Sequence, residues 1–299
     1  MPKMPLAITG FAALIVAVLL LTLTPSSAPS LLDSDSLIVE ASFYPLAEFA
    51  RQVGGDLITV GTITPGGIEP HEYQPTSRAI TAIYGADVFL WNGDGLDVWA
   101  EAIAPEVAAK GVISVKMSAM VDSRYDDPHF WLDPAIAIQA VNAIRDTLSA
   151  IDPTRAETFT NNAAAYSQQL SQLDADYRAG LTRCDNRVVV TPHAAFTYLA
   201  NEYQFDVIPI TGLSPEEEPS AGRLSAIAEL AKEKNIKYIY FETLVSPKLA
   251  QTIADEIGAQ TLVLNPIEGL TNEDIAAGKN YLSIMRENLT NLKTGMLCQ

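Results

Sequence analysis

The feature of this sequence that most constrains its fold is one long amphipathic segment in the middle of the chain. Between residues 153 and 182, apolar side chains recur at spacings of three and four, as they do along one face of an α-helix. They are Phe159, Ala163, Tyr166, Leu170, Leu173, Tyr177 and Leu181. Such a helix is roughly 45 Å long, about the height of a small domain. We therefore predict that it joins two lobes.

On both sides of this segment, short apolar runs that favour strands alternate with segments that favour helices. Strands are predicted at 37–42, 57–63, 87–91, 112–115, 187–190, 206–210, 237–241 and 260–264. Strands that alternate with helices form mainly parallel sheets covered by helices. The predicted fold class is α/β, with two lobes, each a mainly parallel sheet flanked by helices, joined by one long rigid helix. The lobes are expected at 37–150 and 184–299, with the linking helix at 151–183.

Capping residues mark two helix starts. Asp133 is a good N-cap and Pro134 a good first helical residue, so a helix is expected from about residue 135 to 151. Further on, Thr271-Asn272-Glu273-Asp274 resembles a capping box in which aspartate stands where glutamate or glutamine is usual. This box is expected to open the final helix.

The amino-terminus has the order of a secretory signal. Lys3 precedes an uncharged stretch at residues 5–30 that is apolar between Leu6 and Leu23 and then rich in small residues. The apolar run is also long enough to serve as an uncleaved membrane anchor. No cysteine lies near its end, so a lipid anchor is not indicated. We predict a signal peptide or N-terminal anchor at 1–36, with a cleaved signal favoured, and a periplasmic or other extracytoplasmic protein.

Charge and cysteine content exclude several classes of function. The formal net charge is -17 and the sequence pI is about 4.5. Nucleic acids and anionic membrane surfaces bind clustered Lys and Arg, so neither is an expected partner. Only Cys184 and Cys298 occur, without a Cys-x-x-Cys motif, which argues against a thiolate zinc site. In an exported protein these two cysteines could form a disulfide or remain free thiols.

The chain contains only three histidines, His71, His129 and His193. A proline precedes each of them, at positions 70, 128 and 192. Proline fixes its own φ and favours an extended conformation in the residue before it, so each imidazole is presented from a stiffened turn. We predict that the three rings converge on one transition-metal ion. The alternative is three unrelated histidines on surface loops.

Four motifs in this order carry a resemblance to a known family. They are Pro70-His71-Glu72-Tyr73, Asp127-Pro-His-Phe-Trp-Leu-Asp-Pro134, Thr191-Pro-His-Ala-Ala-Phe-Thr-Tyr198 and Tyr281-Leu-Ser-Ile-Met-Arg-Glu-Asn-Leu289. Over about residues 37–297 the chain resembles the metal-binding subunits of bacterial ABC importers for zinc and manganese, the ZnuA/TroA type of solute-binding protein. The resemblance implies two α/β lobes with the metal buried between them. It also implies ligands from His71 and His129 in the first lobe and His193 in the second.

The fourth ligand is where the chain departs from that family. The family position is usually an aspartate in a Leu-Asp-Pro context, and here it aligns with Leu264-Asn265-Pro266. Asn265 offers a carbonyl oxygen but no charge, so three neutral imidazoles and Asn265 would leave the site at +2. Alternatively Asn265 is only a turn residue, and a water, Glu72 or Glu242 completes the shell. For Glu242 a supporting or rim position is favoured over direct ligation.

Three imidazoles favour Zn²⁺, because Mn²⁺ prefers sites richer in carboxylate oxygen. The resemblance adds that manganese carriers typically have glutamate at the position of His193. The predicted function is high-affinity capture of Zn²⁺ by a monomer and delivery to an ABC transporter membrane permease, with a manganese or iron carrier as the alternative. Since histidine binds metal only when neutral, affinity should fall steeply below about pH 6.

A zinc-dependent hydrolase or lyase is the rival from another class. Three histidines and a water also form a catalytic arrangement. The chain has no His-Glu-x-x-His motif and no separate candidate base, so we predict that it is not an enzyme. Two further alternatives are a binder of a chelated metal, which leaves the three imidazoles unexplained, and a surface adhesin, which could coexist with metal binding.

Overall fold

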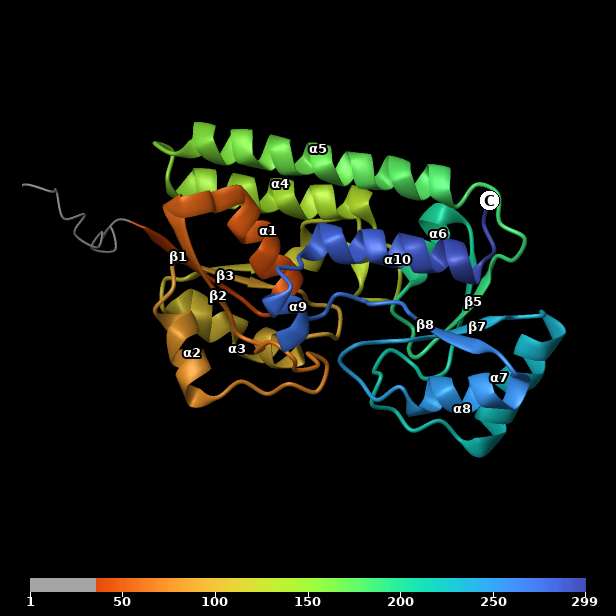
Figure 1. Ribbon diagram of the computed structural model, residues 1–299. Coiled ribbons are helices and arrows are strands. Elements are labelled where there is room, and N and C mark those ends of the chain that lie inside the picture. Colours follow the sequence, from red (N-terminus) through yellow and green to blue (C-terminus); the bar gives the residue numbers. More distant parts are fainter. Residues whose placement is uncertain (1–35) are drawn as a thin grey trace, which may run out of the picture. The chain divides into compact units, whose positions relative to one another are not determined.

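The computed structural model describes residues 36–299 (Figure 1). The predicted signal peptide or anchor, apart from Ser36, lies outside the described residues. Leu37–Gln299 form one compact unit. Within the described part of the chain, no helix is both long enough and apolar enough to cross a membrane.

The compact unit contains two parallel sheets of four strands each. The first has the order β2-β1-β3-β4 and the second the order β6-β5-β7-β8. The strands are β1 (Leu37–Ala41), β2 (Ile58–Thr62), β3 (Val88–Trp91), β4 (Ile113–Lys116), β5 (Val188–Thr191), β6 (Asp206–Pro209), β7 (Tyr238–Phe241) and β8 (Gln260–Val263). All four residues of β3 are buried, as expected for a strand covered on both faces. The predicted α/β fold with two mainly parallel sheets is confirmed.

Helices flank both sheets. The first half contributes α1 (Tyr44–Gly54), α2 (Ser77–Tyr84), α3 (Val98–Ala109) and α4 (Pro134–Ile151), and the second half α6 (Thr197–Tyr203), α7 (Ala221–Glu233) and α8 (Lys248–Ile257). The start of α4 is as predicted, because the Asp133 carboxylate accepts a hydrogen bond from the N–H of Ala135 at 2.8 Å. The lobe boundaries near residues 150 and 184 stay a prediction.

The long helix is α5 (Ala156–Gly180), which at 25 residues measures roughly 38 Å. It begins three residues later than predicted, since Asp152 accepts hydrogen bonds from the N–H and hydroxyl of Thr154 and holds a turn there. All seven apolar side chains of its predicted face are buried. They pack α5 against α4 and against α10 (Tyr281–Gly295), so α5 lies alongside these helices (Figure 1).

The end of the chain differs from the prediction. The capping box of Thr271 and Asp274 forms, but it opens the short helix α9 (Asn272–Ala276) and not the final helix. Gly278 follows in the left-handed conformation with a φ of 67°, which glycine adopts without a Cβ penalty. Asn280 then caps a new helix by accepting a hydrogen bond from the N–H of Ser283 at 2.9 Å. The final helix, α10, therefore has a cap of its own.

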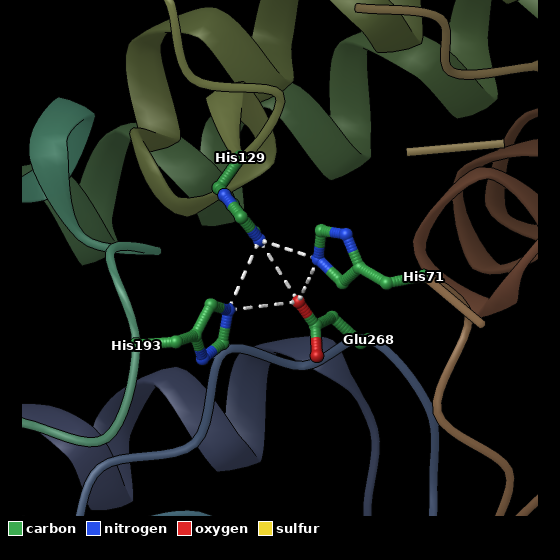
Figure 2. A group of neighbouring side chains, drawn as sticks. All are labelled: His71, His129, His193 and Glu268. Atoms are coloured by element: carbon green, nitrogen blue, oxygen red, sulfur yellow. Dashed lines mark hydrogen bonds and ion pairs between the residues drawn. The ribbon is translucent and has the colours of Figure 1, made fainter. Parts of the chain in front are cut away.

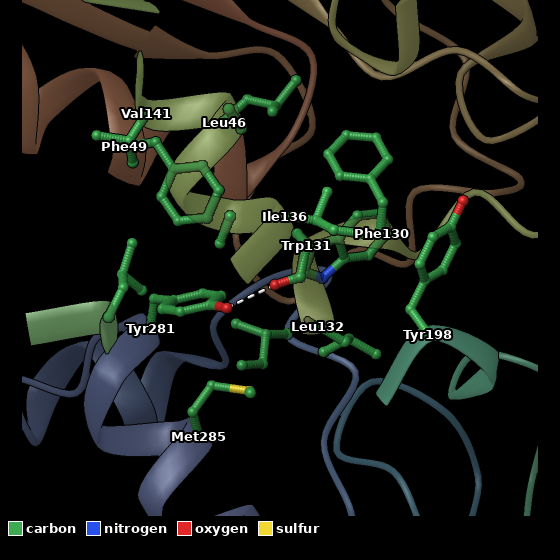
Figure 3. Packing of buried hydrophobic residues seen from close by; sticks show 14 of the residues in the cluster. Leu46, Phe49, Phe130, Trp131, Leu132, Ile136, Val141, Tyr198, Tyr281 and Met285 are labelled. Carbon is green, nitrogen blue, oxygen red and sulfur yellow. Dashed lines mark hydrogen bonds between the residues drawn. The ribbon is translucent and has the colours of Figure 1, made fainter. Parts of the chain in front are cut away.

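Helix α10 packs against segments that lie more than 100 residues earlier in the chain. The Tyr281 hydroxyl donates to the carbonyl of Trp131 at 2.5 Å, and the Tyr177 hydroxyl donates to the carbonyl of Met285 at 2.7 Å. Figure 3 shows Tyr281 and Met285 beside the buried residues around Trp131. After α10, Cys298 forms a disulfide with Cys184, 114 residues earlier in the chain. The open question of whether the two cysteines pair is thus answered in the structure.

Candidate metal centre

Four side chains meet at one point in the structure: His71, His129, His193 and Glu268 (Figure 2). One ligand atom from each lies within 4.8 Å of all the others. His129 Nε2 is 3.2 Å from His71 Nε2 and 3.3 Å from His193 Nε2. Glu268 Oε1 lies 2.9 Å from the Nε2 of His129, 3.3 Å from that of His71 and 3.4 Å from that of His193.

These separations match the edges of a zinc tetrahedron. With bonds of about 2.0–2.1 Å, the ligand atoms of a tetrahedral Zn²⁺ site lie about 3.3 Å from one another. The five separations given above range from 2.9 to 3.4 Å. Three imidazole nitrogens and one carboxylate oxygen are also ligand types that Zn²⁺ accepts. Five of the six separations are therefore close to those of a tetrahedral Zn²⁺ site, and the sixth, between the ligand atoms of His71 and His193, is at most 4.8 Å.

The fold places these residues together because both sheets contribute loops from the same kind of edge. His71 follows β2, His193 follows β5 and Glu268 follows β8, each beyond the carboxyl end of its strand. Ligands of open α/β sheets bind at this edge. His129 comes from the loop just before the short 3₁₀ helix η3 (Phe130–Leu132), which leads into α4. Segments far apart in the sequence therefore converge.

The group is almost completely removed from solvent. His129 and His193 are fully buried, Glu268 is 2% exposed, and the side chain of His71 is 6% exposed. Beside the His71 loop lies a cavity of about 730 Å³. Its lining consists of Ile68, Glu69, Glu72, Tyr73, Gln74, Ser214, Glu216 and Glu217, from loops of both halves of the chain. His71 is thus the most exposed of the four side chains, and its neighbours in the sequence line the cavity.

Two carboxylates orient the buried histidines by contacting Nδ1, the ring nitrogen that does not face the other three side chains. Asp127 Oδ1 lies 2.6 Å from Nδ1 of His129, and Glu242 Oε1 lies 2.8 Å from Nδ1 of His193. A carboxylate at Nδ1 holds the proton there, which leaves the Nε2 lone pair free to bind a metal. Glu242 therefore has the supporting position that was favoured for it.

The carboxylates also set the protonation of the centre. Burial alone would lower the pKa of His193, but Glu242 and Glu268 outweigh it and raise that pKa well above its ordinary value. Burial would likewise lower the pKa of His129, but the carboxylates of Asp127 and Glu268 outweigh burial and raise that pKa. Burial lowers the pKa of His71. Although burial opposes its charge, the three histidines hold the pKa of Glu268 well below its ordinary value, so Glu268 is anionic at neutral pH.

The fourth side chain of the group is Glu268, which was not among the candidates for the fourth ligand; Asn265 was one of them. The Asn265 side chain is engaged elsewhere: its Oδ1 accepts from the N–H of Ile267 at 2.7 Å and its Nδ2 donates to Thr243 Oγ1 at 3.0 Å. Glu72 is exposed at the cavity, 3.4 Å from Ser214 Oγ. The available signal for Glu268 was an acidic residue in the loop after a predicted strand, at the edge that also carries His193.

Comparison with known proteins identifies the family. The ZnuA family, described as "Zinc-uptake complex component A periplasmic", matches residues 39–295. The zinc-binding lipoprotein AdcA of Streptococcus pneumoniae is 41% identical over 276 residues, which is 86% of this chain and 55% of that protein. The high-affinity zinc uptake system protein ZnuA of Bacillus subtilis is 36% identical over 293 residues, 92% of this chain and 91% of that protein.

A solved structure shares the fold. The Zn(II)-bound ZnuA-like domain of Streptococcus pneumoniae AdcA aligns with a TM-score of 0.78 and 42% sequence identity, covering 87% of this chain and 99% of that domain. The chain spans about half the length of the Streptococcus pneumoniae AdcA proteins that it matches. Since the family match takes in both sheets and all four converging side chains, the chain belongs to the ZnuA family.

Proposed function

We propose that this protein captures a transition-metal ion, with Zn²⁺ as its physiological cargo, and delivers it to the membrane permease of an ABC importer. The observation that carries the proposal is the convergence of three imidazole nitrogens and one carboxylate oxygen, with five of their six separations between 2.9 and 3.4 Å. Relatives named for zinc binding and zinc uptake support the choice of cargo.

The donor set supports zinc over manganese. Imidazole suits borderline ions, whereas Mn²⁺ prefers carboxylate and water oxygens. With Glu268 as fourth ligand, three neutral imidazoles and one carboxylate leave a Zn²⁺ complex with a net charge of +1. A site completed by Asn265 would have kept the full +2. The carboxylate thus makes burial of the ion less costly.

The number of side chains that could ligate the metal ion favours metal binding and transport over catalysis. Catalytic zinc sites have three protein ligands and keep the fourth position for water or substrate. Here His71, His129, His193 and Glu268 would occupy all four positions of a tetrahedral ion. A zinc-dependent hydrolase or lyase would need one of these side chains to leave. We therefore infer a binding protein that is not an enzyme. We also propose that it acts as a monomer, because one chain supplies all four side chains.

An extracytoplasmic location fits this function. The family description includes the word periplasmic, and the relative from S. pneumoniae is named a lipoprotein. The disulfide between Cys184 and Cys298 also suits an oxidising compartment. We propose that the protein meets its cargo outside the cytoplasm and hands it to the permease at the membrane.

Titration of the metal-free protein with Zn²⁺ and with Mn²⁺ tests the proposal. We expect one Zn²⁺ per chain, and an affinity for Mn²⁺ at least about 100-fold weaker, because imidazole-rich sites follow the order of intrinsic metal affinities. Isothermal titration calorimetry measures both, and native mass spectrometry gives the stoichiometry. Absence of zinc binding, or tighter binding of Mn²⁺, would contradict the proposal.

The raised histidine pKa values predict how zinc affinity depends on pH. His129 and His193 hold protons between the ordinary pKa of about 6.5 and their raised values, and Zn²⁺ must displace these protons. As the pH is lowered, the affinity for Zn²⁺ should therefore begin to fall before pH 6.5 is reached. The fall should be about tenfold per pH unit for each displaced proton. His71, whose pKa is lowered, and Glu268, which is anionic, release none in this range.

Calorimetry at pH 7 in two buffers with different ionisation enthalpies measures this proton release. We expect between about one and two protons per Zn²⁺, from His129 and His193. Equal heats in the two buffers would show that both histidines are already neutral. The loss of affinity would then begin only below about pH 6, as expected for an unperturbed imidazole.

A further inference from the structure

The residue just before Glu268 has an unusual backbone conformation. Ile267 is fully buried and has a φ of 60°, in the left-handed region. Of the five described non-glycine residues with positive φ, it is the only β-branched one. Left-handed conformations are unfavourable for β-branched residues and persist only where surrounding contacts enforce them. A set of contacts must therefore hold the turn that leads into the carboxylate of the metal centre.

The first of these contacts comes from Asn265. Its Oδ1 accepts a hydrogen bond from the N–H of Ile267 at 2.7 Å, which closes a side-chain turn around Pro266. Its Nδ2 donates to Thr243 Oγ1 at 3.0 Å and so fixes which way the amide faces. Asn265 is only 4% exposed, and water therefore competes little for these bonds.

The turn is also held from two other elements. Asn288 of α10 accepts from the N–H of Asn265 at 2.8 Å and donates to its carbonyl at 2.7 Å. The indole N–H of Trp131 donates to the carbonyl of Pro266 at 2.8 Å. Trp131 lies two residues after His129, and the two rings have their centroids 5.1 Å apart. The same contacts thus connect the Glu268 turn with the loop that carries His129.

We propose that Asn265 is a positioning residue: it holds Ile267 in the left-handed conformation and thereby directs Glu268 at the three histidines. Without the side-chain acceptor, nothing from residue 265 compensates the unfavourable φ of Ile267. Rotation of that residue to negative φ turns the chain at Glu268 and carries its carboxylate away from His129 Nε2. The inference rests on the proposed function and gives Asn265 a role other than ligation.

A double-mutant cycle with Glu268 tests this role. Asn265→Ala should weaken Zn²⁺ binding by roughly 10- to 100-fold, the usual effect of removing a residue that supports a metal ligand. Asn265→Asp, which keeps the acceptor for the N–H of Ile267, should stay close to the wild type. In a Glu268→Gln background, Asn265→Ala should change the affinity by less than about threefold, because the group that Asn265 positions is already lost.

Asn291→Ala is the matched control. Asn291 donates from its Nδ2 to the backbone carbonyl of Val263 at the end of β8, at 2.9 Å, and its side chain makes no hydrogen bond to the turn at 265–268. Its loss should leave zinc affinity within about twofold. A wild-type affinity for Asn265→Ala, or a full effect of that substitution in the Glu268→Gln background, would overturn the proposal.

A readout that does not need zinc separates this inference from the proposed function. The crystal structure of metal-free Asn265→Ala should show Ile267 at negative φ and Glu268 Oε1 out of hydrogen-bonding distance of His129 Nε2, against 2.9 Å with Asn265 present. Asn265→Leu, which fills similar space without an acceptor, serves if the alanine variant does not fold. Ile267 still at a φ near 60° with Glu268 in place would overturn the positioning role. Failure of the wild type to bind zinc would instead overturn the proposed function.

Discussion

Replacement of Glu268 by glutamine is expected to lower the affinity for Zn²⁺ by roughly 100-fold or more. Glu268 is the one carboxylate among the four converging side chains, and it is 2% exposed. Glutamine keeps the size of the side chain and removes its charge. Loss of one partner from a buried, hydrogen-bonded charge pair costs about 3 kcal/mol or more, which corresponds to roughly 100-fold or more in a dissociation constant.

The matched control for this variant is Glu72→Gln. Glu72 is next to His71 in the sequence and was an alternative fourth ligand, but it is exposed at the cavity. Its replacement should leave zinc affinity within about twofold, as expected for a solvent-exposed charge. Competition titration with a chromophoric chelator measures both variants on the same scale. A large effect of Glu72→Gln with a small effect of Glu268→Gln would exchange the two assignments.

Much of the fold could be predicted because it is expressed in local patterns. The eight strands are short apolar runs between helical segments, and the structure has a strand at each of the eight places. The apolar face of α5 could be predicted from its period in the same way. The end of the chain could not, because the capping box at Thr271 is a correct local signal for a helix of only five residues. The final helix begins at a cap of its own, Asn280, after the left-handed Gly278.

The metal centre was predictable only in part, because one of its four side chains is brought to the others by contacts between segments far apart in the sequence. The three histidines share a proline context that can be read locally. Glu268 has no such context, and it meets His129 across 139 residues of sequence. Its place depends on the alignment of β8 with β7 and on the left-handed backbone at Ile267. Asn265 lies in the Leu-x-Pro context that suggested a ligand, but its Oδ1 accepts a hydrogen bond from the N–H of Ile267 and its Nδ2 donates to Thr243 Oγ1.

The disulfide near the end of α10 is expected to contribute to stability. The disulfide between Cys184 and Cys298 joins the chain just after α5 to the chain just after α10. Backbone hydrogen bonds accompany it, from the N–H of Asn186 to the carbonyl of Met296 at 3.1 Å and from the N–H of Gln299 to the carbonyl of Arg183 at 2.9 Å. The disulfide therefore closes a loop that contains nearly the whole second half of the chain, including β5–β8 and α10.

Removal of this disulfide is expected to lower the free energy of unfolding by about 5 kcal/mol, because the cross-link restricts a loop of 114 residues in the unfolded chain. The double variant Cys184→Ala/Cys298→Ala should melt roughly 10 °C below the wild type when both are metal-free. Reductant should lower the melting temperature of the wild type to that of the double variant and leave the double variant unchanged, so that the effect belongs to the bond and not to the side chains. Equal melting temperatures for oxidised wild type and double variant would mean that the backbone contacts and the packing of α10 hold the second half without the covalent link.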